Sequence, residues 1–344
     1  MAREKVLILC DSDGGRKELA DAIAEYIRRQ EGEYIRLGFE DLIFKEDTLL
    51  LDYDGADTNV ILKKDRKEIS LKKEIKSVLY LFQKIPSADK IKGLKEDESQ
   101  FFSQEWQSFM QGIWLLLKDR LWMNPYPNYF VYQDKCYQLD LARRLGFKIP
   151  RTVIATSLKE AYERLKAIND QIIYKTFSQQ FFKQEDKQGK ESTYGIYTNI
   201  IEKEDLQKEE PAIKTPTIFQ VYIPKKVEIR ITVVGKTTFA AEIHSQQSQK
   251  SRIDWRRYDL KNTPCYKHNL PDDIKQKCVA MVENMGLTYS AIDMILTPGG
   301  DYVFLELNPS GLYGWLEHLA KLPITENIAR MLLEGSVHYQ ARLE

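Results

Sequence analysis

The chain has 344 residues, and a chain of this length is expected to fold as two or three packed units. Lysine plus arginine equals aspartate plus glutamate at 51 each, so no overall charge favours nucleic acid or an anionic membrane. The four cysteines are widely spaced without a CxxC or Cys/His pattern, which argues against a zinc site and fits a reduced cytoplasmic protein. No segment approaches the ~20 apolar residues of a membrane span, and the N-terminal apolar run is too short for a signal sequence. We therefore expect a cytoplasmic protein.

The chain opens with a pattern typical of α/β proteins. An apolar run at residues 5–10 predicts a buried parallel strand, and residues 16–29 predict a helix with one apolar face. No GxGxxG follows the strand, so we interpret residues 1–125 as a structural or substrate-side domain rather than a dinucleotide site. Between 45 and 105 the periodicity is weak, and we expect the charge-rich pieces there to be solvated loops.

The pattern becomes regular again at residue 135. Residues 135–146 predict a helix closed by a glycine, and a capping-box pattern of Ser157 and Glu160 begins a second helix. A strand is expected at 171–177. The polar stretch 178–195 predicts a mobile hairpin or lid, with a plain surface loop as an equal alternative. These elements define a second unit, residues 126–215.

The third unit, residues 216–344, is predicted to combine strands and helices. The expected elements are strands at 215–223, 226–235, 237–244 and 289–307, a loop at 245–264, and helices at 271–285 and within 312–335. The fold class is therefore α/β.

The final strand pair carries the strongest chemical pattern. A two-residue turn at Gly299-Gly300 would place Asp293 directly opposite Glu306, with Asn308 on the same face. Like charges in opposed positions destabilise a sheet, and a bound cation would remove that cost. Two carboxylates and an amide oxygen suit magnesium, which prefers oxygen ligands. The alternative is a pair of solvated carboxylates on an exposed face.

Two further strands place charged residues where chemistry is possible. Glu228 and Arg230 alternate with apolar residues, so both are expected to face a cleft. The arginine can clamp a phosphoryl group or a substrate carboxylate, or it can form a cross-strand ion pair. Lys175 lies in an otherwise apolar strand, where it is either a phosphate ligand or an edge residue whose ammonium reaches solvent.

The order of these residues resembles the ATP-grasp superfamily, close to its glutamate-ligase branch, over about residues 125–335. The matching positions are Lys135, Lys175, Gln220-Val221-Tyr222-Ile223, Glu228-Ile229-Arg230, Asp254-Trp255-Arg256, Asp293 and Glu306-Leu307-Asn308-Pro309. The segments EIHSQQSQKSRIDWRRYD and NPSGLYGWLEHLAKLPIT further resemble the ATP-grasp ligases that mature microviridins and other graspetides. The stretch after Lys175 departs from the pattern because it lacks the dense glycines of many ATP-grasp phosphate loops.

The resemblance implies an ATP-grasp fold with an N-terminal pre-ATP-grasp domain and a lid hairpin in the central unit. It also implies that ATP and magnesium (Mg2+) are the cofactors. Lys135 and Lys175 would contact phosphates, Val221 and Tyr222 beside Gln220 would meet adenine through backbone groups, and Glu228 would hold the ribose. Arg230 and Arg256 would contact phosphates or acyl-phosphate oxygens, Asp293, Glu306 and Asn308 would bind magnesium, and Asp254 is a candidate base or orienting group.

The implied reaction phosphorylates a side-chain carboxylate of a ribosomally made precursor peptide and closes a macrocycle. The bond would be an ester with Ser or Thr, or an amide with Lys. The expected partner is a peptide with a leader and an acidic, hydroxyl-rich core, and a homodimer is expected, without nucleic acid or membrane. Two alternatives stay open: a glutamate-adding or other small-molecule carboxylate-amine ligase, and a nucleotide-binding regulatory protein without turnover.

Overall fold

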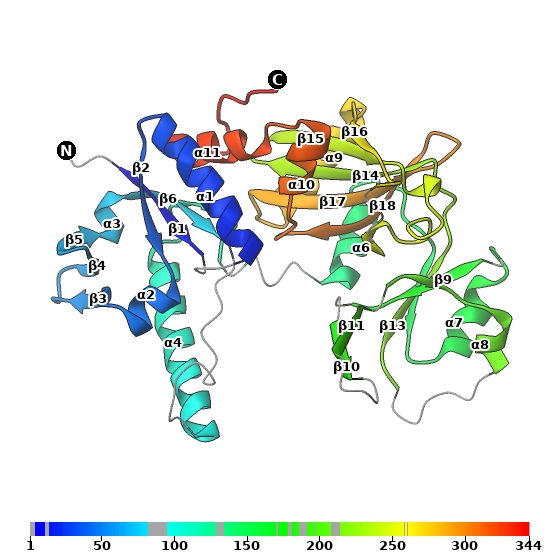
Figure 1. The fold of residues 1–344 in the computed structure, drawn as a ribbon, viewed down its shortest axis with the longest axis horizontal. Coiled ribbons are helices and arrows are strands. Elements are labelled where there is room, and N and C mark those ends of the chain that lie inside the picture. Colours follow the sequence, from blue (N-terminus) through cyan, green and yellow to red (C-terminus); the bar gives the residue numbers. More distant parts are fainter. Residues whose placement is uncertain are drawn as a thin grey trace.

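The computed structural model shows three units, each built around its own sheet (Figure 1). It describes residues 4–10, 14–81, 95–126, 128, 134–169, 171–177, 181–185, 191–195, 197–207, 214–257, 259 and 261–343. In this part of the chain no helix is both long and apolar enough to cross a membrane. The four cysteines are free thiols, and only Cys136 is exposed.

The N-terminal unit contains a parallel sheet in the order β2-β1-β6-β7. Its strands are β1 (Lys5–Leu9), β2 (Glu33–Leu37), β6 (Ile75–Tyr80) and β7 (Leu121–Met123). The helix α1 (Gly14–Arg29) packs on one face of the sheet, and α4 (Glu96–Leu116) packs on the other. The expected α/β opening is confirmed. Alternate residues of the buried strands supply the two cores, as side-chain alternation requires.

The expectation that the charge-rich pieces between residues 45 and 105 are solvated loops holds for the exposed turn within KKDRKE, but the region around it is an ordered sheet, and residues 82–94 lie outside the described part of the chain. The helix α2 (Phe39–Phe44) ends just before this region. The region itself begins with β3 (Thr48–Tyr53), β4 (Thr58–Lys64), β5 (Lys67–Ser70) and α3 (Leu71–Glu74), and the three strands form an antiparallel sheet. Within the charged stretch KKDRKE, Asp65 and Arg66 form the turn between β4 and β5, with φ of 51° and 62°. A turn with positive φ at both residues usually contains Asn or Gly, so the residues of this turn gave no signal for a hairpin. The apolar positions Val60 and Leu62 are buried and anchor the sheet.

The central unit is an antiparallel sheet in the order β12-β9-β13-β8. Its elements are β8 (Thr152–Ala155), α7 (Leu158–Leu165), β9 (Ile172–Lys175), β12 (Asn199–Ile200), α8 (Lys203–Gln207) and β13 (Thr217–Val221). Ser157 accepts a hydrogen bond of 3.3 Å from the Glu160 amide, which confirms the predicted helix start. The strand β13 pairs with β8 and β9, so it belongs to this sheet, although the expected boundary after residue 215 assigns it to the third unit.

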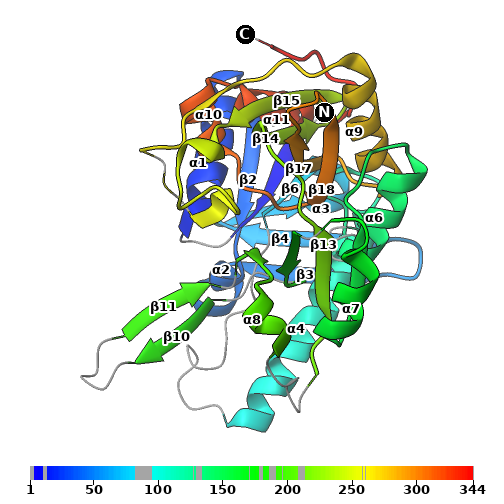
Figure 2. The same ribbon diagram turned by 90° about the vertical axis from the view of Figure 1, so that its right-hand side faces the viewer.

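The strands β10 (Phe181–Glu185) and β11 (Glu191–Gly195) pair with each other and extend away from the central sheet (Figure 2). The hairpin alternative for residues 178–195 is therefore confirmed. Residues 178–180 and 186–190 lie outside the described part of the chain, and the lid movement stays a prediction.

The C-terminal unit is an antiparallel sheet in the order β16-β15-β14-β17-β18. Its strands are β14 (Val227–Val234), β15 (Thr237–Ile243), β16 (Cys265–Lys267), β17 (Tyr289–Leu296) and β18 (Tyr302–Asn308). One face packs against α6 (Lys135–Arg144) and α9 (Asp272–Asn284). The other face meets α10 (Gly314–Ala320) and α11 (Ile324–Glu334) at one end. At its other end this face carries the charged residues described below.

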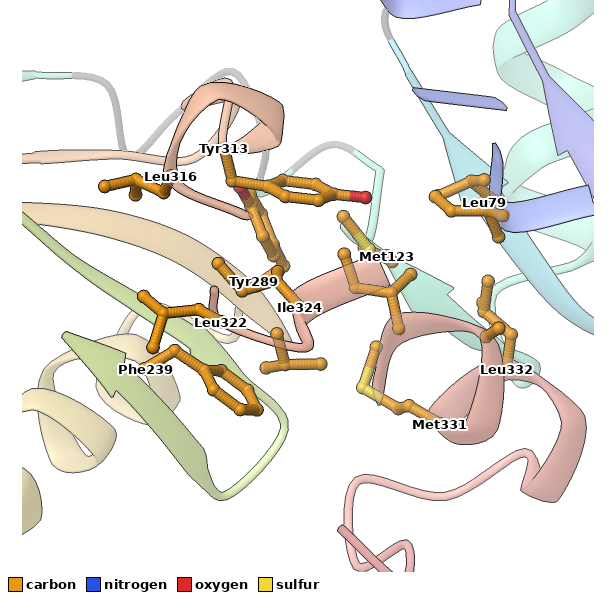
Figure 3. Close-up of a cluster of buried hydrophobic side chains, with 14 of the residues drawn as sticks. Leu79, Met123, Phe239, Tyr289, Tyr313, Leu316, Leu322, Ile324, Met331 and Leu332 are labelled. Atoms are coloured by element: carbon orange, nitrogen blue, oxygen red, sulfur yellow. The ribbon is translucent and has the colours of Figure 1, made fainter. Parts of the chain in front are cut away.

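A single hydrophobic core joins the N-terminal unit to the C-terminal sheet (Figure 3). Leu79 on β6 and Met123 on β7 lie in the same cluster as Tyr289 on β17 and Met331 on α11. The side chain of Asn124 adds polar contacts to this joint. It donates to the carbonyls of Tyr289 and Pro309, both at 2.8 Å, and accepts from the amides of Thr288 and Tyr289. The N-terminal unit is thus part of the scaffold that holds the C-terminal sheet.

Candidate active site

Three charged residues lie in one row across the C-terminal sheet. Arg230 on β14 pairs in register with Asp293 on β17, which pairs with Glu306 on β18. The predicted opposition of Asp293 and Glu306 is therefore confirmed. Arg230 Nη1 lies 2.6 Å from Asp293 Oδ2, so the cross-strand ion pair expected as an alternative for this arginine is present.

The register arises differently from the predicted two-residue turn. The Thr297 amide donates to the Asp301 carbonyl, which leaves a three-residue loop with Gly300 at φ 88°. A bulge then shifts the pairing between Asp293 and Met294 by one residue. The longer loop and the bulge cancel, so Asp293 still lies opposite Glu306.

Glu306 is surrounded by cations. Its Oε2 lies 3.0 Å from Lys135 Nζ, and its Oε1 lies 4.0 Å from Arg256 Nη1. Burial alone would raise the pKa of this carboxyl group, but Lys135, Arg256 and Lys175 together lower it to about 2. Glu306 is therefore ionised at neutral pH.

Burial raises the pKa of Asp293, and the neighbouring Glu306 raises it further, while Arg230 acts in the opposite direction. The expected like-charge conflict is present, but protein cations offset it before any metal binds. Asn308 lies on the next row, opposite Ala291, and its Oδ1 accepts a hydrogen bond from the Ser310 amide at 3.1 Å.

These residues fit a magnesium ion that is coordinated partly by the protein and partly by phosphate oxygens. Within the described residues no group of three or more His, Cys, Asp or Glu side chains is placed to hold a metal by itself. The hydrogen bonds described for this row leave Asp293 Oδ1 and Glu306 Oε1 without a donor. Magnesium commonly takes one or two carboxylates and completes its shell with waters and substrate phosphates. The donor set therefore suits an ion that arrives with a nucleotide.

A cleft between the central sheet and the C-terminal sheet leads to this row. Its walls include Lys175, Gln220, Tyr222, Glu228, Asp254, Arg256, Asp293 and Glu306. Lys175 lies among the charges, and burial lowers its pKa to about 8 although Glu306 acts to raise it. An ammonium group that is buried in this way is stabilised in its charged form by an anionic ligand. The edge alternative, in which the ammonium reaches solvent, does not fit these surroundings.

Gln220 presents an unsatisfied acceptor to the cleft. Its amide nitrogen donates to Thr152 Oγ1 at 2.9 Å, while its Oε1 is buried without a partner. An orphaned acceptor of this kind suits an amino group of a ligand. The N–H groups of Val221 and Tyr222 are bonded to the carbonyls of Arg151 and Gln171. A contact of these two residues with adenine would therefore have to use their carbonyl groups.

Glu228 is held by two residues that the sequence analysis missed. Lys225 Nζ lies 2.7 Å from Glu228 Oε1 and donates to the Ile253 carbonyl at 2.8 Å, and Ser245 donates to the same Oε1 at 2.8 Å. Burial raises the pKa of Glu228, and Lys225 is the largest opposing influence. Lysine three residues before the glutamate was the available signal, but Ser245 comes from a distant loop.

Arg256 is gripped by Asp254. Arg256 Nε donates to Asp254 Oδ1 at 2.9 Å and Nη2 to Oδ2 at 2.6 Å. Despite burial, this pairing holds the pKa of Asp254 well below its usual range. Of the two roles considered for Asp254, the contacts fit the orienting group, because a carboxylate with several donors is a poor proton acceptor.

The loop that follows β18 packs against Arg230, one of the three charged residues of the row. A Cβ at Gly311 would lie 2.4 Å from the Ala291 Cβ and 2.6 Å from Arg230 Nη2, so only glycine fits there. Tyr289 donates to the Gly311 carbonyl and holds the loop in place. The loop therefore limits the positions open to the Arg230 guanidinium.

Comparisons with solved structures agree with this architecture, although no family model and no curated protein matches the chain. A RiPP-associated ATP-grasp ligase from Chryseobacterium gregarium, solved with ADP and a leader and core peptide, is 26% identical, with 97% of both chains covered and a TM-score of 0.84. The macrocyclase MdnC from Microcystis aeruginosa, bound with precursor peptide MdnA, is 27% identical, with 96% of this chain and 99% of that chain covered and a TM-score of 0.76.

A more distant likeness concerns the fold alone. D-alanine–D-alanine ligase from Bacillus anthracis, complexed with ATP, is 14% identical, with 98% of this chain and 97% of that chain covered and a TM-score of 0.56. The fold is that of the ATP-grasp ligases, and the similarity to the first two structures identifies the protein as an enzyme of this class. Within that class the chain is similar, over nearly its whole length, to RiPP-associated ATP-grasp ligases and peptide macrocyclases.

Proposed function

We propose that this protein uses ATP and magnesium to close side-chain macrocycles in a ribosomally made precursor peptide. The observation that carries the proposal is the row of Arg230, Asp293 and Glu306 at the end of a cleft lined by Lys175 and Gln220. The similar ligase from Chryseobacterium gregarium was solved with ADP and with a leader and core peptide, which supports the same ligands here.

The reaction consists of two transfers. An oxygen of the peptide carboxylate attacks the γ-phosphorus of ATP, the bond from that phosphorus to the bridging oxygen breaks, and ADP leaves. A peptide hydroxyl or amine then attacks the acyl carbon of the acyl phosphate. The carbon–oxygen bond to phosphate breaks, inorganic phosphate leaves, and the nucleophile loses its proton. Each ring thus costs one ATP and removes the elements of one water from the peptide.

The residues of the cleft divide this work. Lys135 and Lys175 bind phosphate oxygens, Gln220 Oε1 accepts from the adenine amino group, and Glu228 holds the ribose.

Asp293, Glu306 and Asn308 hold magnesium, which neutralises charge on the transferring phosphoryl group when it is bound. Arg230 and Arg256 place positive charge beside the same oxygens. Only Nη1 of Arg230 is paired with Asp293, and its buried Nε has no partner among the described residues, so the guanidinium keeps a donor for such an oxygen.

The proposed peptide partner has a leader and a core rich in acidic and hydroxyl residues, and the enzyme acts as a homodimer. We expect an ester because a carboxylate activated as an acyl phosphate reacts with a hydroxyl only where water is kept out, and the cleft lies between two packed units. A glutamate-adding or other small-molecule ligase is the second candidate, since the charged row would serve either substrate.

Incubation with ATP, magnesium and a candidate precursor tests the proposal. We expect one water lost from the peptide for each ADP released, read by mass spectrometry and nucleotide analysis. Replacing every Ser and Thr of the core by Ala should abolish the loss. Dehydration that survives this replacement but fails without a peptide lysine would instead establish amide closure. ADP release with free amino acids, and none with any peptide, would favour the small-molecule ligase.

A further inference from the structure

One short segment of the C-terminal unit contacts both walls of the nucleotide cleft. Asp254, which is 4% exposed, precedes the 3-10 helix Trp255–Arg257. Its Oδ2 accepts from Arg256 Nη2 and also, at 3.0 Å, from the amide of Thr198 in the central unit. Its Oδ1 accepts from the amide and Nε of Arg256. One carboxylate therefore binds an arginine of one wall and the backbone of the other.

Arg257 completes the contact from the same segment. Its Nη2 donates to the Thr198 carbonyl at 3.1 Å and to Asn199 Oδ1 at 2.6 Å, and its guanidinium lies 5.7 Å from the centre of the Tyr197 ring. Both backbone polar groups of Thr198 are thus bound by residues 254–257. Thr198 is buried, lines the cleft, and directly precedes β12.

The positions of the two walls are linked through this contact. The strand β12 pairs with β9, which carries Lys175. On the other side, Arg256 has Nε and Nη2 bound to Asp254, and its Nη1 faces Glu306 Oε1 at 4.0 Å. The strand that carries the Lys175 ammonium and the guanidinium of Arg256 are therefore held relative to each other by Asp254 and Thr198.

We propose that Asp254 is a positioning residue. It couples the position of the central unit, through Thr198, to the orientation of the Arg256 guanidinium toward Glu306. The guanidinium is correctly placed only while Thr198 is bound, so ATP is used productively only when both walls of the cleft are together. Loss of the coupling leaves the acyl phosphate open to water, which returns the free carboxylate and phosphate. The inference rests on the proposed ligase function and adds to it a link between the units.

The test uses three variants of the full-length protein. Asp254→Asn removes the charge that binds Arg256 and weakens the hydrogen bond to the Thr198 amide. Arg257→Gln leaves Asp254 and Arg256 intact and removes the contacts of the guanidinium with Thr198, Asn199 and Tyr197. Asp259→Asn is the matched control, because this carboxylate of the same loop binds Ser248 and Asn262, and among the described residues its hydrogen bonds reach neither wall of the cleft. The readouts are kcat, KM for ATP, and the ratio of ADP released to water lost from the peptide.

We expect Asp254→Asn to lower kcat by about 10- to 100-fold, since a small misplacement of a charged group has that effect, while KM for ATP changes by less than about threefold. The ratio of ADP to water lost should rise clearly above the wild-type ratio in Asp254→Asn and in Arg257→Gln. Asp259→Asn should match the wild type in all three readouts.

A merely structural role would lower kcat and thermal stability together and leave the ratio of ADP to water lost unchanged, which would overturn the inference. Should Asp254→Asn fail to fold, Arg257→Gln with an unchanged ratio overturns it equally. Failure of the proposed function looks different, because the wild type itself would then dehydrate no peptide.

Discussion

The carboxylates of the charged row have cationic partners before any ligand arrives. Asp293 lies against Arg230, and Glu306 lies against Lys135 with Arg256 nearby. In the proposed site, binding of magnesium and ATP would exchange these partners: the metal would take the carboxylates, and the phosphates would take the cations. Replacing one of these carboxylates should therefore destabilise the folded protein, because the substitution leaves a buried cation without its partner.

We expect Asp293→Ala to abolish magnesium-dependent ADP release and to lower the free energy of unfolding by about 3 kcal/mol, since breaking a buried ion pair leaves a charge uncompensated. Arg230 is the charge concerned and is 6% exposed. Urea unfolding and an ADP assay measure the two effects. Asp301→Ala is the control, because Asp301 pairs with Lys148 on the surface of the same hairpin and should cost less than about 1 kcal/mol. Wild-type ADP release in Asp293→Ala would refute the metal assignment.

With Lys175 as the proposed phosphate ligand, its lowered pKa of about 8 predicts that ATP binding depends on pH. Between that pH and the ordinary lysine pKa, the unfolded chain holds a proton that the folded protein lacks, so stability rises with pH in this window. ATP favours the charged ammonium, so its affinity should fall as pH rises above about 8. Calorimetry at about pH 7 and pH 9.5 should show this loss in the wild type and little of it in Lys175→Arg, since the guanidinium stays charged. An equal loss in both proteins would assign the effect to another group.

At the scale of elements, the loop after β18 controls the arginine behind it. Gly311→Ala should displace Arg230 or Ala291 and cost about 1–3 kcal/mol, because the added Cβ has no space. ADP release should fall with it. Gly299→Ala is the matched control, since the nearest atom to a Cβ there is Thr297 Oγ1 at 3.7 Å. Thermal unfolding and the ADP assay compare the two, and equal behaviour would mean that the loop tolerates a side chain.

The facing carboxylates could be predicted because alternation along a strand and a glycine pair at its turn are both written in the sequence. The bulge beside Met294 could not, because it is concealed by a loop one residue longer than expected. The grip of Asp254 on Thr198 was equally hidden, since it joins residues 56 positions apart in the chain. The sheet β3-β4-β5 was not predicted, because Asp65 and Arg66 form the turn between β4 and β5 in place of the usual Asn or Gly.

At the scale of the whole molecule, Asn124 tests how firmly the N-terminal unit is joined to the C-terminal sheet. Its buried side chain makes hydrogen bonds with both carbonyls and amides across the joint. We expect Asn124→Ala to lower the free energy of unfolding by about 4 kcal/mol, as roughly 1 kcal/mol is lost with each of these four hydrogen bonds. Calorimetry should show the N-terminal and C-terminal units melting in one transition in the wild type. Two separate transitions there would contradict a shared core.

The shared core also has a consequence for synthesis of the chain. The face of β1 and α1 that contains Val6, Ile8 and Ile23 is covered by Ile328 and Met331 of α11, near the end of the chain. At ~5–20 residues per second, translation of the roughly 300 intervening residues takes about 15–60 seconds. During that time the nascent N-terminal unit presents an apolar surface to the cell. Chaperone demand and aggregation during expression should therefore be set by the arrival of the last helix rather than by the first domain.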